Sequence, residues 1–356
     1  MPVLRQIVAG FRQGDAISNE TLIIRDLCAA HGFDSEIRCP RATAHPKDRA
    51  LTRDVATLPA DVRPDDVALL HLSIGSPANA IFERLPCRKA ILYHNVTPPR
   101  FYERLSPTTA QTLADGLAEV ARLKDAADGV WADSAFNAAE LRAMGYRDPK
   151  VFPLLVDDAF GSGRPDPARV ESLRAHRLQN ILFVGRLAPN KRHDRLIAVF
   201  SSYQRYVNPA SRLVIAGGAY GAEAYKALLL GDVYVWAAKN VVFTGFVEPA
   251  DLYACYATAD AFVCMSDHEG FCAPLLEAMA WHVPVFANAA GAVPETLDGA
   301  GVLVRPEDPP EVVAETIGRV INDPALRAAV VKKQDERLAR FRARDPWSEL
   351  REILGV

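Results

Sequence analysis

Short apolar runs rich in β-branched residues alternate with helical stretches through most of the chain. In the first half the runs are LRQIVAG, ALLHLSI, KAILYHNV, GVWADS and KVFPLLV. The second half repeats the scheme with NILFVGR, RLVIAGG, NVVFTG, AFVCM, VPVFAN and GVLV. Such alternation is typical of βαβ units, whose parallel sheets are covered by helices on both faces. The sequence therefore predicts an α/β protein.

A chain of 356 residues is longer than a single hydrophobic core usually supports, so we expect two domains. The two halves predict two Rossmann-like, doubly wound parallel-sheet domains that face a cleft, over residues 1–160 and 161–339. Turn formers and charges make DDAFGSGRPDPARVES, residues 157–172, the best linker candidate. A terminal helix over about 340–356 is expected to complete the first domain. Open α/β sheets bind ligands beyond the carboxyl ends of their strands.

Bulk composition excludes several classes of protein. A formal net charge of −3 gives no strong field for nucleic acid. None of the six cysteines forms a C-x-x-C pair, which favours reduced thiols over a disulfide framework or a zinc site. The start lacks the apolar stretch of a signal peptide, and no apolar run reaches the length of about 18 residues that a membrane span needs. We expect a cytoplasmic protein without a nucleic-acid partner.

Two cations follow the first strand of the second half. The run NILFVGRLAPNK ends its strand at Val184, turns at Gly185, and carries Arg186 and Lys191 on the next loop. A guanidinium fork and a mobile ammonium suit a diphosphate, although two solvated loop charges would give the same pattern. The glycines of RLVIAGGAYG lack the G-x-G-x-x-G spacing, which argues against a dinucleotide-binding dehydrogenase.

The stretch HEGFCAPLLEA places two carboxylates eight positions apart, after a buried strand and inside the next helix. Glu269 can accept from sugar hydroxyls, and Glu277, in apolar surroundings, needs donors that the two hydroxyls of a ribose would supply. Pro274 suits the first helical turn, whose positive end favours a phosphate. The backbone N–H groups expected to face that phosphate belong to Phe271, Cys272 and Ala273, after Gly270. Phe246 and Val247, which follow NVVFTG, could lie against a flat base.

The order GRL…K, VVFTGFV and HEGFCAPLLEAMAWHVPVFANAAGAVPE resembles the nucleotide-sugar-binding half of family 4 glycosyltransferases over about residues 180–304. These are retaining enzymes of the GT-B fold with an E-x₇-E motif. The resemblance implies that Arg186 and Lys191 bind the donor diphosphate. It also implies that Glu269 holds the transferred sugar and that Glu277 holds the ribose. Cys272 stands where the family motif more often has glycine.

The first half resembles the same family more loosely. The loop GDAISNE resembles the glycine-containing loop of the family, and the resemblance implies that Gly14 lies near the transferred sugar. By the resemblance His94, in ILYHNVTPP, contacts the sugar beside the acceptor, and His71 is the second candidate. A histidine after a strand is also often only structural. Ser134 and Asn137 suit helix capping as well as ligand contact.

The activity implied is retaining transfer of a hexose from a nucleoside-diphosphate sugar to a glycan or lipid-linked acceptor. EGFC and YHNVTPP resemble bacterial mannosyltransferases of surface polysaccharides, which makes GDP-mannose the first choice of donor and a UDP-hexose the second. No D-x-D triplet occurs, so we expect no metal and no other cofactor. A sugar phosphorylase, an epimerase of the same fold and an inactive scaffold remain alternatives. Peripheral attachment to the inner face of the cell membrane also stays open.

Overall fold

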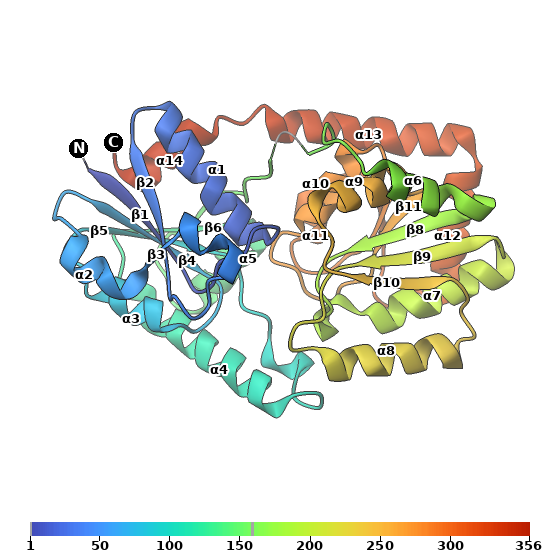
Figure 1. Ribbon diagram of the computed structural model, residues 1–356, viewed down its shortest axis with the longest axis horizontal. Helices are drawn as coiled ribbons and strands as arrows, with labels where there is room; N and C mark the ends of the chain where they lie inside the picture. The colour runs from blue at the N-terminus through green and yellow to red at the C-terminus, as the bar shows by residue number, and fades with distance from the viewer. Residues whose placement is uncertain (1, 158–159) are drawn as a thin grey trace. The chain divides into compact units, whose positions relative to one another are not determined.

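The computed structural model describes residues 2–157 and 160–356, which form two compact units (Figure 1). The first unit comprises the residues up to 157 together with 344–356, and the second comprises those from 160 to 343. Within the predicted linker, residues 158–159 lie outside the described residues. Each unit is described by itself below.

The first unit is built on a seven-stranded sheet in the order β3-β2-β1-β4-β5-β6-β7. All its strand pairs are parallel. The direction of winding reverses between β1 and β4, which creates a topological switch point at their carboxyl ends. The strands are β1 (Val3–Val8), β2 (Asp34–Cys39), β3 (Arg53–Asp54), β4 (Val67–Leu72), β5 (Arg88–Tyr93), β6 (Gly129–Ala132) and β7 (Lys150–Val151).

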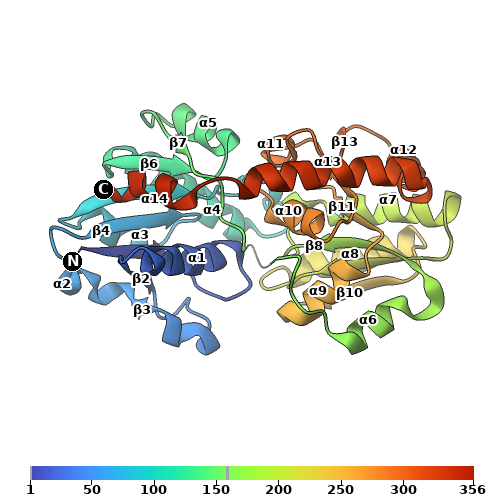
Figure 2. The ribbon, with the colours of Figure 1, turned by 90° about the horizontal axis from the view of Figure 1, so that it is seen from above.

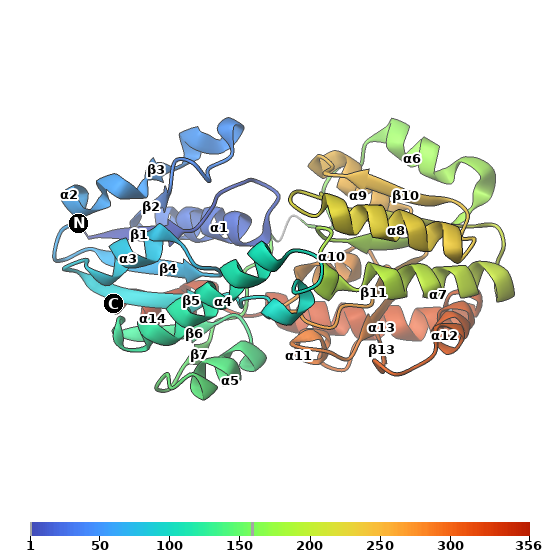
Figure 3. The same ribbon diagram turned by 90° about the horizontal axis from the view of Figure 1, so that it is seen from below.

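Helices cover both faces of this sheet. One core joins α1 (Ala16–Ala30) and the terminal helix α14 (Pro346–Leu354) to the sheet, and Figure 2 shows these two helices in front of it. The other core joins α3 (Pro77–Glu83), α4 (Pro107–Arg122) and α5 (Ala135–Ala143), with α3 and α4 in front in Figure 3. The shorter elements are α2 (Leu58–Asp61), η1 (Pro46–Leu51), η2 (Val55–Thr57), η3 (Pro99–Phe101) and η4 (Leu123–Asp125).

The second unit has a six-stranded sheet in the order β10-β9-β8-β11-β12-β13, again with parallel pairs. Its strands are β8 (Gln179–Val184), β9 (Ser211–Ala216), β10 (Val241–Gly245), β11 (Ala261–Cys264), β12 (Val285–Asn288) and β13 (Val302–Val304). The prediction of two Rossmann-like parallel-sheet domains is thereby confirmed.

Figures 1 and 3 show α7 (His193–Tyr206) and α8 (Glu223–Val235) on one face of the second sheet. On the other face lie α9 (Pro249–Ala257), α10 (Ala273–Ala280) and the long α13 (Pro324–Arg342), as Figure 2 also shows. The remaining elements are α6 (Pro167–Arg174), α11 (Val293–Leu297), α12 (Pro310–Asn322), η5 (Ala175–Arg177) and η6 (Pro189–Lys191).

Three strands depart from the sequence prediction, namely β7, β2 and the two-residue β3, which no predicted run contains. The run KVFPLLV forms a strand only at its first two residues, because Pro153 has no N–H to give to a sheet. Conversely β2, DSEIRC, was not predicted, because its charged residues break the apolar pattern on which the prediction rested. The structure instead pairs Glu36 and Arg38 of this strand with charged residues of other segments.

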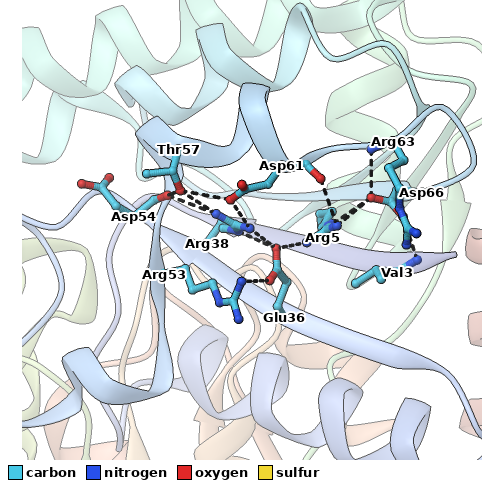
Figure 4. Close-up of polar contacts among 10 residues, drawn as sticks. All are labelled: Val3, Arg5, Glu36, Arg38, Arg53, Asp54, Thr57, Asp61, Arg63 and Asp66. Carbon is cyan, nitrogen blue, oxygen red and sulfur yellow. Dashed lines mark hydrogen bonds and ion pairs between the residues drawn. The ribbon is translucent and has the colours of Figure 1, made fainter. Parts of the chain in front are cut away.

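The charged side chains of β1 and β2 form a buried network in the first unit (Figure 4). Arg5 Nη2 lies 2.8 Å from Asp66 Oδ2, just before β4, and Arg5 also pairs with Glu36. The fully buried Arg38 joins Glu36 at 2.5 Å and Asp61 at 2.9 Å. Buried charges of this kind require partners, since an unpaired charge in the interior is strongly destabilising. The network therefore explains how a charged segment forms an interior strand.

Candidate functional site

The strongest candidate site lies at the switch point of the second unit, where β8 and β11 are neighbours. The loop after β8 carries Gly185 and Arg186 and ends in η6, whose last residue is Lys191. The loop after β11 runs from Met265 to Cys272, where α10 begins. Both loops leave the carboxyl ends of adjacent parallel strands, the edge at which open α/β sheets bind ligands.

Lys191 and Glu269 join these two loops directly. Lys191 Nζ lies 2.7 Å and 2.8 Å from the two oxygens of Glu269, and Ser266 Oγ donates to Glu269 Oε1 at 2.7 Å. The two charged side chains are 18% and 7% exposed. Burial lowers the pKa of Lys191, but the charge and hydrogen bonds of Glu269 outweigh it and leave that pKa raised. Lys191 is therefore a fixed ammonium group beside a fixed carboxylate.

Three residues that sequence reasoning missed hold this pair in place. Asn190 Nδ2 donates to His268 O at 3.0 Å, and the Asp267 N–H donates to Asn190 O at 2.8 Å. Gly291, at φ 57°, lies so close to Glu269 that a Cβ would meet the Glu269 carbonyl oxygen at 2.4 Å. Ser266 is the third. A single sequence gave no signal for Asn190 or Ser266, whereas Gly291 stands inside the stretch that carries the family resemblance.

The loop after β11 turns into α10 through a left-handed residue. Cys272 is the N-cap residue of α10 with φ 71° and ψ 60°, and its side chain makes no capping hydrogen bond. Left-handed backbone costs a residue with a Cβ roughly 1–2 kcal/mol, which explains why glycine is the usual residue at this position of the motif. Pro274 lies in the first turn, as the sequence predicted. The start of α10 therefore offers a positive helix end beside Lys191 and Glu269.

Glu277 lies one turn into α10 and contacts a tyrosine. The Tyr256 hydroxyl donates to Glu277 Oε2 at 2.7 Å. Burial raises the pKa of Glu277 to about 7, although the Tyr256 hydrogen bond lowers it. Tyr256 is fully buried, and its hydroxyl also orients this carboxylate. A carboxylate with this raised pKa needs further donors to stay ionised, and ligand hydroxyls would provide them.

The other predicted donor-site residues lie on the same edge with different exposure. Gly185 has φ 151°, and a Cβ there would lie 3.9 Å from Lys191 Cε, so the turn packs against the lysine stem. Arg186 is exposed on the loop after β8. Phe246, 40% exposed, and the half-buried Val247 follow β10. Phe271 and Ala273 are buried and Gly270 is half-buried.

The predicted residues of the first unit lie at its own switch point. His94 follows β5 and lies against His71 of β4, with His94 Nε2 3.0 Å from His71 Nδ1. The His94 side chain is 1% exposed, and its Nδ1 lies 3.5 Å from Asp133 Oδ2. Both ring nitrogens thus face protein groups, and the contact of His94 with a sugar stays a prediction.

The remaining candidates of the first unit are Gly14, the N-cap residue Ser134 of α5, and Asn137 within α5. Gly14 is exposed after β1 at φ 89°, and its N–H donates to Asn19 Oδ1 at 3.0 Å. Ser134 caps α5 by accepting from the Asn137 N–H at 3.1 Å. Of the two roles that the sequence allowed for Ser134, helix capping is therefore the one that the structure shows.

Two groups of side chains have ligand atoms close enough to share a metal ion. They are Glu20, His71 and His94 in the first unit, and Cys264, Glu269 and Cys272 in the second. In the second group the Lys191 ammonium already contacts both oxygens of Glu269, and a cation there would have to displace it. The sequence-based expectation of no metal and no other cofactor stays a prediction.

Comparison with known proteins identifies the second unit. Residues 167–337 match the family model described as glycosyl transferases group 1. The second unit is a group 1 glycosyltransferase domain. The matched range contains all the candidate donor-site residues from Gly185 to Glu277. The sequence-based resemblance to this class is thereby confirmed.

Bacterial mannosyltransferases are among the relatives of the glycosyltransferase domain. Over 145 residues the chain is 37% identical to the GDP-mannose-dependent alpha-(1-6)-phosphatidylinositol monomannoside mannosyltransferase of Mycobacterium tuberculosis, covering 38% of this chain and 37% of that protein. It is 25% identical to the serotype-specific mannosyltransferase WbdA of Escherichia coli over 327 residues, 85% of this chain and 39% of WbdA. The chain thus matches well under two thirds of the length of either relative.

Solved glycosyltransferases share the fold of the whole chain. HepE of Anabaena, solved in complex with UDP and glucose, superposes with a TM-score of 0.75 and 18% identity over 100% of both chains. At this identity the likeness concerns the fold, which is GT-B.

Proposed function

We propose that this protein transfers a hexose from a nucleoside-diphosphate sugar to a hydroxyl group of a glycan or a lipid-linked glycan. The observation that carries the proposal is the contact between Lys191 and Glu269 beside the start of α10. This contact brings a cation and a carboxylate together at one sheet edge, an arrangement that suits a diphosphate and sugar hydroxyls. Glu277, one turn further along α10, is suited to the ribose hydroxyls.

The chemical demand of this reaction is charge stabilisation. As the bond to the sugar breaks, negative charge builds on the departing diphosphate and the sugar becomes oxocarbenium-like. In this proposal Lys191, Arg186 and the amides at the start of α10 stabilise the diphosphate. Fixed donors of this kind are often the largest single contribution to catalysis, because they need no reorganisation as the charge develops. Glu269, held by Ser266 and Lys191, orients the sugar.

Metal independence and retention of configuration are parts of the same proposal. Two side-chain cations and a helix end supply positive charge for the diphosphate, and the chain has no D-x-D triplet of acidic metal ligands. Transfer is therefore expected to continue when divalent cations are removed with EDTA. The anomeric configuration of the product, read by proton NMR, should match that of the donor.

We infer that GDP-mannose is the donor and that mannose is the sugar transferred. The support comes from the mycobacterial relative, whose name specifies GDP-mannose, and from WbdA, whose alignment covers 85% of this chain. A UDP-hexose is the second candidate, supported by HepE, which was solved with UDP and glucose. Phe246 and Val247, on the loop after β10, are the residues expected to lie against the base.

A lipid-linked acceptor would place the protein on the cytoplasmic face of the membrane as a peripheral protein. Among the described helices, none combines the length and the hydrophobicity that crossing a bilayer requires. Peripheral attachment can be tested by flotation of the full chain with anionic and neutral vesicles.

The proposed function is tested by offering GDP-mannose, UDP-glucose and UDP-N-acetylglucosamine separately, each with mannose-terminated glycan and lipid acceptors. We expect acceptor-dependent release of GDP from GDP-mannose and a new glycosidic product, with and without EDTA. Phosphorolysis, seen as a sugar phosphate formed only with inorganic phosphate, would instead identify a phosphorylase. Epimerised donor without any acceptor product would identify an epimerase. No turnover of any donor would support an inactive scaffold.

A further inference from the structure

Arg192, which directly follows Lys191, has a backbone conformation that is unusual for arginine. It has φ 49° and ψ 48°, in the left-handed region, and it stands between η6 and α7 as the N-cap residue of α7. A residue with a Cβ is strained in this region, whereas glycine adopts it freely. The Arg192 side chain makes no capping hydrogen bond to α7. Neither the turn nor the start of the helix therefore explains an arginine at this position.

The Arg192 guanidinium contacts carboxylates from two different elements. Its Nε lies 3.1 Å from each oxygen of Asp194, in the first turn of α7. Its Nη1 donates to Asp267 Oδ2 at 2.6 Å, across 75 residues of sequence, on the loop after β11. A planar guanidinium can hold two carboxylates in fixed directions. Because these two acids already balance its charge, Arg192 is poorly suited to bind a diphosphate, and it instead ties the loop after β11 to the start of α7.

Asp267 is also held by Asn288, the last residue of β12. The fully buried Asn288 side chain donates through Nδ2 to Asp267 Oδ1 at 3.2 Å and to Ser266 O at 3.1 Å. Arg192 and Asn288 thus take one oxygen each of the same carboxylate. The Asp267 N–H donates to Asn190 O at 2.8 Å. Asp267 is therefore the point at which the loop after β11 is fixed to the segments on either side of it.

Along both loops this ion pair lies beside the contact between Lys191 and Glu269. Lys191 immediately precedes Arg192. Glu269 follows Asp267 by two residues. Because neighbouring residues of a chain move together, the distance between the loops at the ion pair limits the distance at which the Lys191 ammonium meets Glu269. That distance matters for a reaction, since a catalytic group misplaced by about 1 Å can cost about 100-fold in rate.

We propose that Arg192 and Asp267 are positioning residues, whose ion pair fixes the loop after β11 so that Glu269 meets Lys191. Neither Arg192 nor Asp267 contacts the donor. The effect of the ion pair on the transfer rate rests on the proposed function, whereas the fixed position of the loop needs no substrate. The competing interpretation is purely structural, since ion pairs between partly exposed side chains often stabilise little, and these two side chains are 35% and 27% exposed.

Arg192→Gly separates the two interpretations, because it removes the guanidinium and also relieves the left-handed backbone, so the melting temperature should stay near that of the wild type. With the donor that the wild type turns over, we expect kcat to fall about 10–100-fold and the donor KM to change less than about threefold, because the displaced group acts mainly in the transition state. Arg192→Lys keeps the charge but lacks the planar fork, and should recover part of the rate. Arg305→Ala removes an exposed arginine that pairs with Asp308 in the same unit, and should leave kcat unchanged.

Asp267→Asn provides the second side of a double-mutant cycle, and it carries the kinetic test if Arg192→Gly does not fold. It keeps the shape of the side chain and removes the charge, so kcat should fall in the same direction. The double variant should be no slower than Arg192→Gly alone, within about threefold, because both changes remove one interaction. Losses that multiply in the double variant, or a wild-type kcat in both single variants, would overturn the proposal.

Hydrogen exchange of the full chain without substrate reads the position of the loop. The Asp267 N–H, which donates to Asn190 O, should exchange at least about tenfold faster in Arg192→Gly than in the wild type or in Arg305→Ala. Unchanged exchange would overturn the proposal even if the transfer rate falls. If the wild type transfers no sugar, the proposed function fails, and hydrogen exchange alone decides whether Arg192 fixes the loop.

Discussion

Lys191 Nζ contacts both carboxylate oxygens of Glu269, at 2.7 and 2.8 Å, across 78 residues of sequence. The contact joins the loops that leave β8 and β11, the two strands at the switch point of the second sheet. Each group fixes the other, so little side-chain freedom remains to be lost when a ligand binds. We interpret the pair as a preorganised site. A diphosphate would bind to Lys191 there, and sugar hydroxyls would donate hydrogen bonds to Glu269.

Replacing Lys191 with alanine should reduce the transfer rate at least about 100-fold, the scale seen when one oriented donor to a developing charge is lost. It should also lower the free energy of unfolding by about 1–3 kcal/mol, because Glu269 would keep a mostly buried charge without its cation. The exposed Lys239 of the same unit provides the control, and Lys239→Ala should change neither quantity. Near-normal turnover by Lys191→Ala would remove Lys191 from the mechanism.

Glu277→Gln should stabilise the ligand-free protein at high pH. The pKa of Glu277 is raised to about 7 in the fold, against an ordinary value of 4.5, so its contribution to stability is lost as pH rises from 4.5 through about 7. Glutamine can still accept from Tyr256 but carries no charge. We expect a gain of about 1–3 kcal/mol at pH 8 and almost none at pH 4, from denaturant unfolding. An equal effect at both pH values would contradict the raised pKa.

Cys272 should tolerate glycine better than valine. Glycine relieves the left-handed strain at φ 71° and loses only a small buried thiol, so Cys272→Gly should lie within about 1 kcal/mol of the wild-type stability. A β-branched valine is a poor fit to this backbone and should cost more than about 2 kcal/mol. Thermal unfolding of the two variants measures the difference. Equal melting temperatures for both would argue against the left-handed turn.

The stabilisation of the first unit by Asp66 should depend on pH. Burial raises its pKa, but hydrogen bonds from the Arg63 N–H, Arg5 and the Val3 N–H outweigh it and leave the pKa lowered. Its stabilisation is therefore present above the ordinary value of 3.8 and lost as pH falls through the lowered pKa. Asp66→Asn should destabilise β1 and β4 by about 3–5 kcal/mol at pH 7, measured by hydrogen exchange.

At pH 2 the same Asp66→Asn substitution should cost much less. The neighbouring Asp65 is exposed, so Asp65→Asn is the matched control and should have little effect at either pH. A pH-independent loss in Asp66→Asn would mean that shape, rather than charge, explains the role of Asp66.

Much of the fold could be predicted because the buried strands are visible in the sequence as apolar runs. AFVCM and VPVFAN became the neighbouring strands β11 and β12, which are buried along their whole length. The strand β2 was missed because its core contribution depends on Arg38 and Glu36, which are stable inside only through partners from distant segments. Ion pairs between segments leave no periodic pattern in a sequence.

The candidate site was predictable in its residue types but not in its contacts. Loop position and the E-x₇-E spacing placed Lys191, Glu269 and Glu277 on one edge of the sheet. Nothing in the sequence indicated that Tyr256 would donate to Glu277, because the tyrosine fits the apolar face of α9 equally well as core. Likewise the environment of His94 depends on Glu20 and Asp133, which only the fold brings to it.

The central claim is that the edge formed by Lys191, Glu269 and α10 binds a nucleoside diphosphate. Isothermal titration calorimetry of GDP and UDP against the wild-type chain and Glu277→Gln tests this most directly. We expect GDP to bind the wild type more tightly than UDP, and the substitution to weaken GDP binding about tenfold or more, because it removes a charged acceptor of the ribose hydroxyls. Absence of binding by either nucleotide, or equal affinity of the two proteins for GDP, would contradict the account.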